Sequence, residues 1–112
     1  MNANIVYRLK NPLEGEVWLG NNQRYSDSIR VKSRPLVITR VNGEEVEFYR
    51  CTSNANVPGA YHIQDPISAG LYKETFVILK KERGSIKQLG HRFGVLSKFD
   101  KEALGELQGG WR

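Results

Sequence analysis

Apolar and polar residues alternate with a period of two along several short segments of this chain, which predicts β-strands with one buried face. The clearest pair is the β-branched run at residues 35–41 and the alternating run at residues 44–51, separated by Asn42-Gly43. Asn-Gly between two such runs indicates a two-residue type I′ turn, because both central residues must adopt positive φ. We therefore expect an antiparallel hairpin here.

The register of this hairpin follows by counting outward from the pair Val41 and Glu44. The expected cross-strand pairs are Arg40 with Glu45, Thr39 with Val46, Val37 with Phe48 and Arg34 with Cys51. Thr52 then lies one step beyond, near Arg34 at the open end of the ribbon. A strict register puts Arg34 and Thr52 on opposite faces, so a bulge or twist at the strand end would be needed to direct both at one site.

Further strands are expected on either side of the hairpin. The pattern predicts strands at residues 14–19, 60–64, 75–80 (an apolar run typical of a central strand) and 85–96, the last interrupted by Gly90 and Gly94. Residues 21–32 are polar and rich in turn formers, so we expect a long exposed loop of the kind that is often functional. Residues 1–13 are predicted to be an N-terminal extension, and residues 52–58 a turn-rich loop.

The period changes to that of a helix at residues 98–108. Phe99, Ala103, Leu104 and Leu107 fall on one helical face and are expected to pack on the sheet. Ser97 can cap this helix, with Asp100 at its third position, and Gly109-Gly110 ends it. Residues 109–112 form a tail. The pattern as a whole predicts a single mainly β domain, a small β-barrel or sandwich with a C-terminal α-helix.

Composition narrows the function classes. The 112 residues suit one domain, and because no apolar run is long enough for a bilayer or a signal peptide, we expect a soluble, cytoplasmic protein. The one cysteine, Cys51, excludes an intramolecular disulfide, and its apolar strand predicts a buried hydrophobe rather than a reactive thiol. Metal-ligand spacings, a P-loop and a dinucleotide glycine motif are all absent from the sequence, so we expect neither metal nor cofactor.

The net charge of +5 and the pI of about 9.5 favour binding to polyanions through the long-range field and counterion release. Charge of this size is compatible with nucleic-acid binding without being specific for it.

Six sequence motifs resemble, in order, those of the MazF/PemK toxins, a family of type II toxin–antitoxin endoribonucleases. They are GEVW at 15–18, the polar loop after it, SRPLVIT at 33–39, CTS at 51–53, AGLYKETFVILKK at 69–81 and FGVLSKFDKEAL at 93–104. The resemblance implies an SH3-like barrel, a homodimer and a ribonuclease that is neutralised by a cognate antitoxin. It also implies catalytic roles for Arg34 and Thr52. Lys81-Glu82 departs from an acidic residue and a Gln found in some relatives.

The chemistry implied by this resemblance needs no metal, because RNA supplies its own nucleophile, the 2′-hydroxyl. The expected reaction is sequence-selective cleavage of single-stranded RNA such as mRNA. The planar fork of Arg34 can hold two phosphate oxygens, and the hydroxyl of Thr52 can donate or accept a hydrogen bond. Ser53 is a further catalytic candidate that could replace or assist Thr52. The general base is not obvious, and His62 and His91 are the two histidines available for it.

Candidate RNA-binding residues combine cations for phosphates with rings for bases. They are Arg24, Tyr25, Arg30 and Lys32 in the expected loop, together with His62. A solvated loop explains the first four equally well. Trp18 is expected in the core or a dimer interface, and the basic run from Lys80 to Lys87 is either a solvated face or an extension of an RNA track.

Two alternatives stay open from the sequence. The first is an SH3-like barrel that binds nucleic acid or protein and cleaves nothing. The second is a toxin on the same scaffold that inhibits a protein target such as gyrase, with its activity in the C-terminal helix between Phe99 and Arg112.

Overall fold

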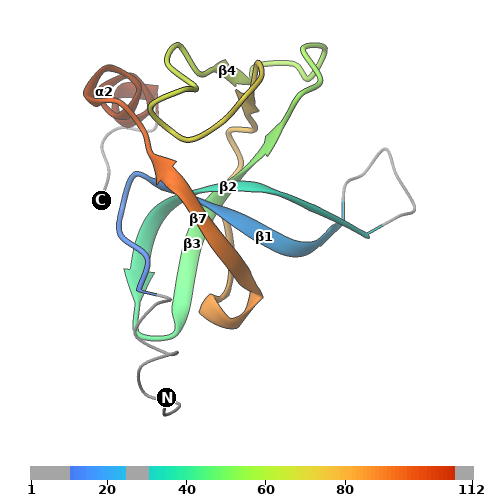
Figure 1. Cartoon of the computed structure of the whole chain (residues 1–112), viewed down its shortest axis with the longest axis vertical. Helices are drawn as coiled ribbons and strands as arrows, with labels where there is room; N and C mark the ends of the chain where they lie inside the picture. The colour runs from blue at the N-terminus through green and yellow to red at the C-terminus, as the bar shows by residue number, and fades with distance from the viewer. Residues whose placement is uncertain (1–10, 25–30, 108–112) are drawn as a thin grey trace.

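An antiparallel, curved sheet forms the body of the molecule, and one α-helix lies against it (Figure 1). The computed structural model describes residues 11–24 and 31–107. The strand order is β4-β5-β3-β2-β1-β7, with β6 paired to β3 off this path. The elements are β1 (Glu16–Arg24), β2 (Val31–Asn42), β3 (Glu45–Thr52), β4 (Tyr61–His62), β5 (Phe76–Val77), β6 (Glu82–Ser85), the 3₁₀-helix η1 (Ile86–Gln88), β7 (Leu89–Val95) and α2 (Lys98–Leu107). The predicted mainly β class with a C-terminal helix is confirmed.

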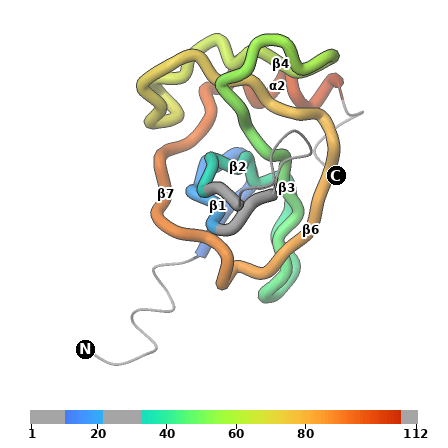
Figure 2. The backbone as a smooth tube through the Cα atoms, turned by 90° about the vertical axis from the view of Figure 1, so that its right-hand side faces the viewer, coloured from blue at the N-terminus to red at the C-terminus, as the bar shows by residue number. Residues whose placement is uncertain are grey.

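The curvature of the sheet is visible in Figure 2, where β7, β3 and β6 surround β1 and β2. Strand β3 pairs with β2 along one edge and with two strands along the other. Its first half pairs with β6 and its end pairs with β5. This branching at β3 brings elements that are far apart in the sequence to the end of one strand.

The predicted loop at residues 21–32 is wrong at both of its ends. Strand β1 continues to Arg24 and β2 begins at Val31, with Gln23 opposite Lys32 and Arg24 opposite Val31 after an irregularity at Gly20–Gln23. The two strands form a ribbon that extends away from the body of the sheet (Figure 1). Because backbone pairing needs no apolar side chains, a polar sequence gives no hydrophobic pattern that would indicate such a ribbon.

The hairpin between β2 and β3 exists, but its predicted register is wrong. Asn42 pairs with Glu45, so the two-residue turn is Gly43-Glu44, with Gly43 at φ 64°. The register then shifts between Ile38 and Arg40, where Thr39 is an extra residue in β2. The observed pairs are Val41 with Val46, Arg40 with Glu47, Ile38 with Phe48, Val37 with Tyr49 and Leu36 with Arg50.

The segments after β3 are shorter or more divided than predicted. Only Tyr61–His62 of residues 60–64 and Phe76–Val77 of residues 75–80 are strands. The predicted strand at 85–96 is interrupted by η1, because Ser85 and Gln88 form a capping box: the Lys87 N–H donates to Ser85 Oγ, and the Ser85 N–H donates to Gln88 Oε1. Gly90 and Gly94 do not interrupt β7, which runs through both of them.

The core consists of two apolar clusters on the two faces of the central strands. Val17 and Val37 belong to the cluster that also contains Leu104 of α2, whereas Trp18 and Leu36 belong to the other. Trp18 is 3% exposed, so the expectation that it is buried is confirmed. Its indole N–H donates to Glu16 Oε1 at 3.0 Å, which gives the Glu and Trp of the GEVW motif a structural role.

Helix α2 is capped as predicted, but its packing differs from the prediction. The Asp100 N–H donates to Ser97 Oγ at 3.1 Å. Leu104 is fully buried, whereas Phe99 and Leu107 are 65% and 58% exposed. The predicted packing of Phe99 and Leu107 is therefore wrong, because the face turned to the sheet is centred on Asp100 and Leu104 instead.

Candidate functional site

Arg34 and Thr52 lie on one face of the sheet. Arg34 is two residues before Leu36, and Thr52 two residues after Arg50, the partner of Leu36 in the ladder. Because alternate residues of a strand share a face and directly opposite residues point the same way, both side chains lie on the Leu36 face. The pairing of β2 with β3 ends at Leu36 and Arg50, and beyond it Thr52 pairs with Phe76 of β5.

The bulge at Thr39 is what produces this arrangement. Without it, the pairs nearest the turn would continue to place Arg34 opposite residue 53. The extra residue in β2 shifts the register by one, so that Arg34 and Thr52 fall on the same face. Both side chains are half-buried, and neither belongs to an apolar core cluster. The strict-register expectation of opposite faces is thus wrong.

A row of side chains continues this line across the sheet. Thr52 pairs with Phe76 of β5, and Phe76 pairs with His62 of β4. The neighbouring row, Cys51 with Val77 and Val77 with Tyr61, faces the core, where Cys51 and Val77 are fully buried. The Thr52–Phe76–His62 row therefore faces outward from three strands.

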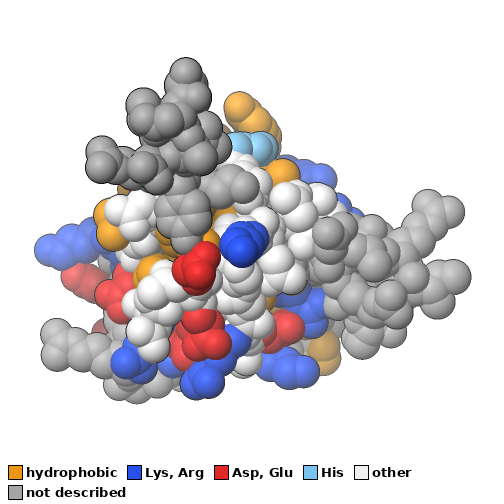
Figure 3. Space-filling view, turned by 90° about the horizontal axis from the view of Figure 1, so that it is seen from below, with side chains coloured by type: hydrophobic (Ala, Val, Ile, Leu, Met, Phe, Trp, Pro, Cys, Tyr) orange, Lys and Arg blue, Asp and Glu red, His pale blue; other side chains and the backbone are white. Residues whose placement is uncertain are grey.

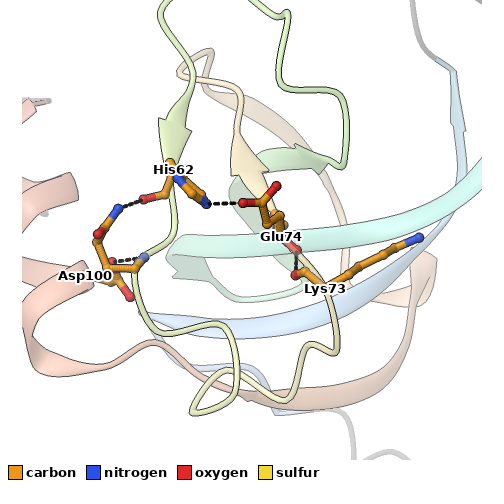
Figure 4. A network of polar contacts seen from close by, with 6 residues as sticks. His62, Lys73, Glu74 and Asp100 are labelled. Atoms are coloured by element: carbon orange, nitrogen blue, oxygen red, sulfur yellow. Dashed lines mark hydrogen bonds and ion pairs between the residues drawn. The ribbon is translucent and has the colours of Figure 1, made fainter.

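The rings of this row are in contact. The His62 and Phe76 ring centroids are 4.6 Å apart with an interplanar angle of 23°, a stacked arrangement. His62 Nε2 lies 3.8 Å from Glu74 Oε1, and Figure 4 shows these two side chains pointing toward each other. The side chain of His62 remains 44% exposed.

The hydroxyl groups at the end of β3 are accessible. The Asn54 N–H donates to Thr52 Oγ1 at 3.1 Å, which leaves the Thr52 O–H able to donate elsewhere. Ser53 is exposed next to it. Thr52 is thus a half-buried residue at the end of β3 whose hydroxyl oxygen accepts from the turn that follows.

Glu82 pairs with Arg50, whose side chain lies on the same face of β3 as Thr52. Arg50 Nε lies 2.5 Å from Glu82 Oε2, and the Arg50 side chain is only 14% exposed. Lys81, the other residue of the unusual Lys81-Glu82 pair, lies 3.4 Å from Glu47 Oε1 through its Nζ. The ion pairs of Glu82 and Lys81 therefore connect β6 and the segment before it to β3.

Asp100 holds the strand that carries His62. Its carboxylate is fully buried and accepts hydrogen bonds from the Tyr61 hydroxyl at 2.5 Å and from the N–H groups of Gln64 and Asp65 at 2.9 and 3.0 Å. Burial alone would raise the pKa of Asp100, but these hydrogen bonds outweigh it and hold that pKa below its ordinary value. Burial and the nearby Asp100 carboxylate raise the pKa of Tyr61 well above its usual range.

The other candidate residues do not belong to the Thr52–Phe76–His62 row. Arg24 and Lys32 lie in paired strands rather than in a loop, and Tyr25 and Arg30 are outside the described residues, as is the tail. His91 is exposed on β7, at the far end of the strand order from β4, so the sheet order does not join it to the Thr52 row. Phe76 was missed by sequence reasoning, because the apolar run at 75–80 concealed that one of its faces points outward.

The opposite end of the hairpin is less suited to a polyanion. A hollow there is lined by Arg40, Asn42, Glu45, Glu47 and Arg83. The view from below shows acidic and basic side chains interspersed over this end (Figure 3). Mixed charge of this kind produces no sustained positive field.

Neither a metal-binding cluster nor a membrane-spanning helix is found within residues 11–24 and 31–107. No group of three or more His, Cys, Asp or Glu side chains is placed to hold a metal ion. In the same part of the chain, no helix has both the length and the apolar character required to cross a membrane.

Comparisons with known proteins support the fold. No protein-family model matches the chain, and no curated protein matches it significantly. Among solved structures, the chain is similar to a mycobacterial endoribonuclease that was determined in complex with its cognate antitoxin. The similarity has a TM-score of 0.57 at 18% identity and covers 88% of this chain and 96% of the other. The architecture of the whole domain is therefore shared with that protein.

Proposed function

We propose that this chain is a toxin endoribonuclease of the MazF/PemK type, which cleaves single-stranded RNA without a metal ion. The observation that carries the proposal is the common, half-exposed face of Arg34 and Thr52, in a domain with the architecture of an endoribonuclease. The net charge of +5 supports a polyanionic substrate. The motif order from residue 15 to residue 104 supports the same family.

The proposed reaction is a transesterification within the RNA. The 2′-oxygen attacks the adjacent phosphorus, a new P–O bond forms, and the bond to the 5′-oxygen of the next nucleotide breaks. The 2′-hydroxyl loses its proton to a base, and the departing 5′-oxygen gains one, giving a 2′,3′-cyclic phosphate and a 5′-hydroxyl. Arg34 stabilises the charge that develops on the non-bridging oxygens, and Thr52 hydrogen-bonds an oxygen of the same group, with Ser53 able to assist.

The remaining candidate residues act in binding. Arg24, Tyr25, Arg30 and Lys32 are proposed to hold the RNA, together with His62 of β4. The proposed partners are an mRNA in the cytoplasm, a cognate antitoxin that blocks this surface, and a second copy of the chain. The antitoxin in the structure of the similar endoribonuclease supports the second of these.

The direct test is cleavage of a mixed-sequence RNA by the purified protein in EDTA. We expect cleavage to persist in EDTA. Arg34→Ala should lower the rate about 10²–10³-fold, the usual loss for one donor to a developing charge. Thr52→Val should lower it about tenfold, as expected for one hydrogen bond. The matched control is Arg40→Ala, an exposed cation on the same strand.

Two outcomes would contradict the proposal. Binding of RNA without any cleavage by the wild-type chain favours the non-catalytic barrel. Equal loss of activity in Arg34→Ala and Arg40→Ala would mean that charge in general, rather than a site at Arg34, governs the effect.

The exposed apolar residues of α2 support the alternative that this chain inhibits a protein target. Phe99 and Leu107 present apolar surface on this helix without packing on the sheet. If growth arrest in cells survives Arg34→Ala but is lost in the Phe99→Ser, Leu107→Ser double variant, the chain inhibits a protein. The nuclease proposal expects the reverse pattern.

A further inference from the structure

We propose that His62 and Phe76 form a stacking platform for a nucleobase of the bound RNA, beside the phosphate held at Arg34 and Thr52. The inference rests on the proposed function and specifies which part of the substrate this surface contacts. Its starting observation is the stacked pair of rings, with centroids 4.6 Å apart and an interplanar angle of 23°.

The platform faces outward because successive side chains of a strand point to opposite faces of the sheet. Val77, the neighbour of Phe76, and Tyr61, the neighbour of His62, belong to or pack against the first core cluster. Phe76 and His62 therefore point away from that cluster. Phe76 is half-buried and is not among the side chains packed against either core cluster of the described residues.

The platform also lies at a suitable distance from the proposed cleavage site. Neighbouring strands are about 4.8 Å apart, so Phe76 and His62 are displaced from Thr52 by about 5 and 10 Å across the sheet. Bases of the nucleotides next to a phosphate at Thr52 are therefore within reach of these rings. A phosphate at Thr52 can thus leave its own base, or the adjacent one, against the His62 ring, whose side chain is 44% exposed.

The rings are held in place before any ligand binds. Asp100 fixes β4 through Tyr61 and the segment after it, and Gln64 Nε2 donates to the His62 carbonyl at 2.9 Å. Glu74, 3.8 Å from His62 Nε2, lies beside the ring edge. Figure 4 shows the His62 ring directed toward Glu74. A ring whose orientation is fixed in advance loses little freedom on binding, and stacking of this kind accepts any base because each has a π-face.

The test uses an RNA oligonucleotide with 2′-fluoro groups, which lacks the nucleophile and so separates binding from cleavage. A fluorescent 2-aminopurine base is placed at each position in turn. We expect strong quenching at one position adjacent to the cleavage site in the wild-type protein, and none there in His62→Ala. Binding should weaken about 5- to 150-fold in His62→Ala and stay within about threefold in His62→Phe, which keeps an aromatic face.

The matched control is His91→Ala. His91 is also exposed, and its ring centroid lies 4.5 Å from that of Phe93, but both residues belong to β7. This variant should bind and quench like the wild type, and thermal melting of each variant verifies its fold. The platform is overturned if His62→Ala binds and quenches normally, or if His62→Lys restores binding where His62→Phe does not, which would indicate a phosphate contact.

The two proposals fail in different ways. If Arg34→Ala abolishes cleavage while His62→Ala changes neither binding nor quenching, the nuclease stands and the platform is wrong. If the fluorinated RNA stacks at His62 but no natural RNA is cleaved, the platform stands and the nuclease is wrong.

Discussion

Asp100, in the first turn of α2, accepts a hydrogen bond from the Tyr61 hydroxyl on β4 across an O–O distance of 2.5 Å. A fully buried carboxylate thereby joins the C-terminal helix to the strand that carries His62. The contact spans 39 positions of the sequence. It makes the helix a support for the candidate site and not only a cover for the core.

The first prediction concerns pH. Because the folded-state pKa of Asp100 lies below its unfolded value, the stability it contributes is present at neutral pH. That stability is lost as the pH falls below about 4, the unfolded value, and through the lower pKa of the folded state. Asp100→Asn should be about 2 kcal/mol less stable at pH 7 and should lose less stability on acidification than the wild type. Urea denaturation at several pH values measures this, with exposed Glu102→Gln of the same helix as control. An unchanged pH dependence in Asp100→Asn would contradict the assignment.

The second prediction concerns the GEVW motif. Glu16 is 7% exposed and accepts hydrogen bonds from the Trp18 indole, the Leu13 N–H and Arg92 Nε, the last at 2.6 Å. Glu16→Leu leaves these donors without their acceptor, so we expect a loss of about 2–3 kcal/mol in the free energy of unfolding. Exposed Glu14→Leu should change it by less than about 0.5 kcal/mol. Similar losses in both variants would argue against the network.

The third prediction compares two apolar residues of α2. Leu104→Ala should cost about 2–4 kcal/mol, because it opens a cavity under the helix. Phe99→Ser should cost less than about 0.5 kcal/mol, because the ring is 65% exposed and the two residues have similar helix propensities. Chemical denaturation of the two variants distinguishes this arrangement from the one expected from sequence, in which both residues pack on the sheet.

The fourth prediction concerns Cys51. Its side chain is fully buried, and burial raises the pKa of its thiol to about 12. Because the thiolate is the reactive form, iodoacetamide should leave the native protein unmodified and alkylate it in urea. Mass spectrometry reads the result directly. Rapid modification of the folded protein would show that the end of β3 opens.

The fifth prediction concerns Glu82. Glu82→Gln removes the charge partner of Arg50, whose side chain shares the face of Arg34 and Thr52. If this face binds RNA, the affinity at low salt should rise about two- to threefold and its salt dependence should become steeper. Filter binding at several salt concentrations tests this, with exposed Glu106→Gln on α2 as control. Unchanged or weaker binding would place the RNA elsewhere.

Much of the local structure could be predicted from the sequence. The β2–β3 hairpin, the cap formed by Ser97 and Asp100, the buried Trp18 and the buried Cys51 all follow from interactions within a few residues or from the burial of a single side chain. The roles of Arg34 and Thr52 were proposed from a resemblance between motifs, and that of His62 from the chemistry of its side chain; all three stay predictions. The sequence also made Arg34 and Thr52 neighbours, but on opposite faces.

The face of each candidate residue depended on tertiary structure. One extra residue at Thr39 changes which side chains oppose each other along β3, and no local signal marks that bulge. The same holds for the Thr52–Phe76–His62 row, because β5 and β4 are two residues each and exist only through pairing with strands far away in the chain.

For this protein, then, the sequence alone determined that β2 and β3 form a hairpin and where α2 begins, because those choices depend on near neighbours. The tertiary structure decided register, the exposure of Phe99 and the convergence of three strands at Thr52. These are collective outcomes of long-range pairing and packing, in which a shift of one residue reverses every face.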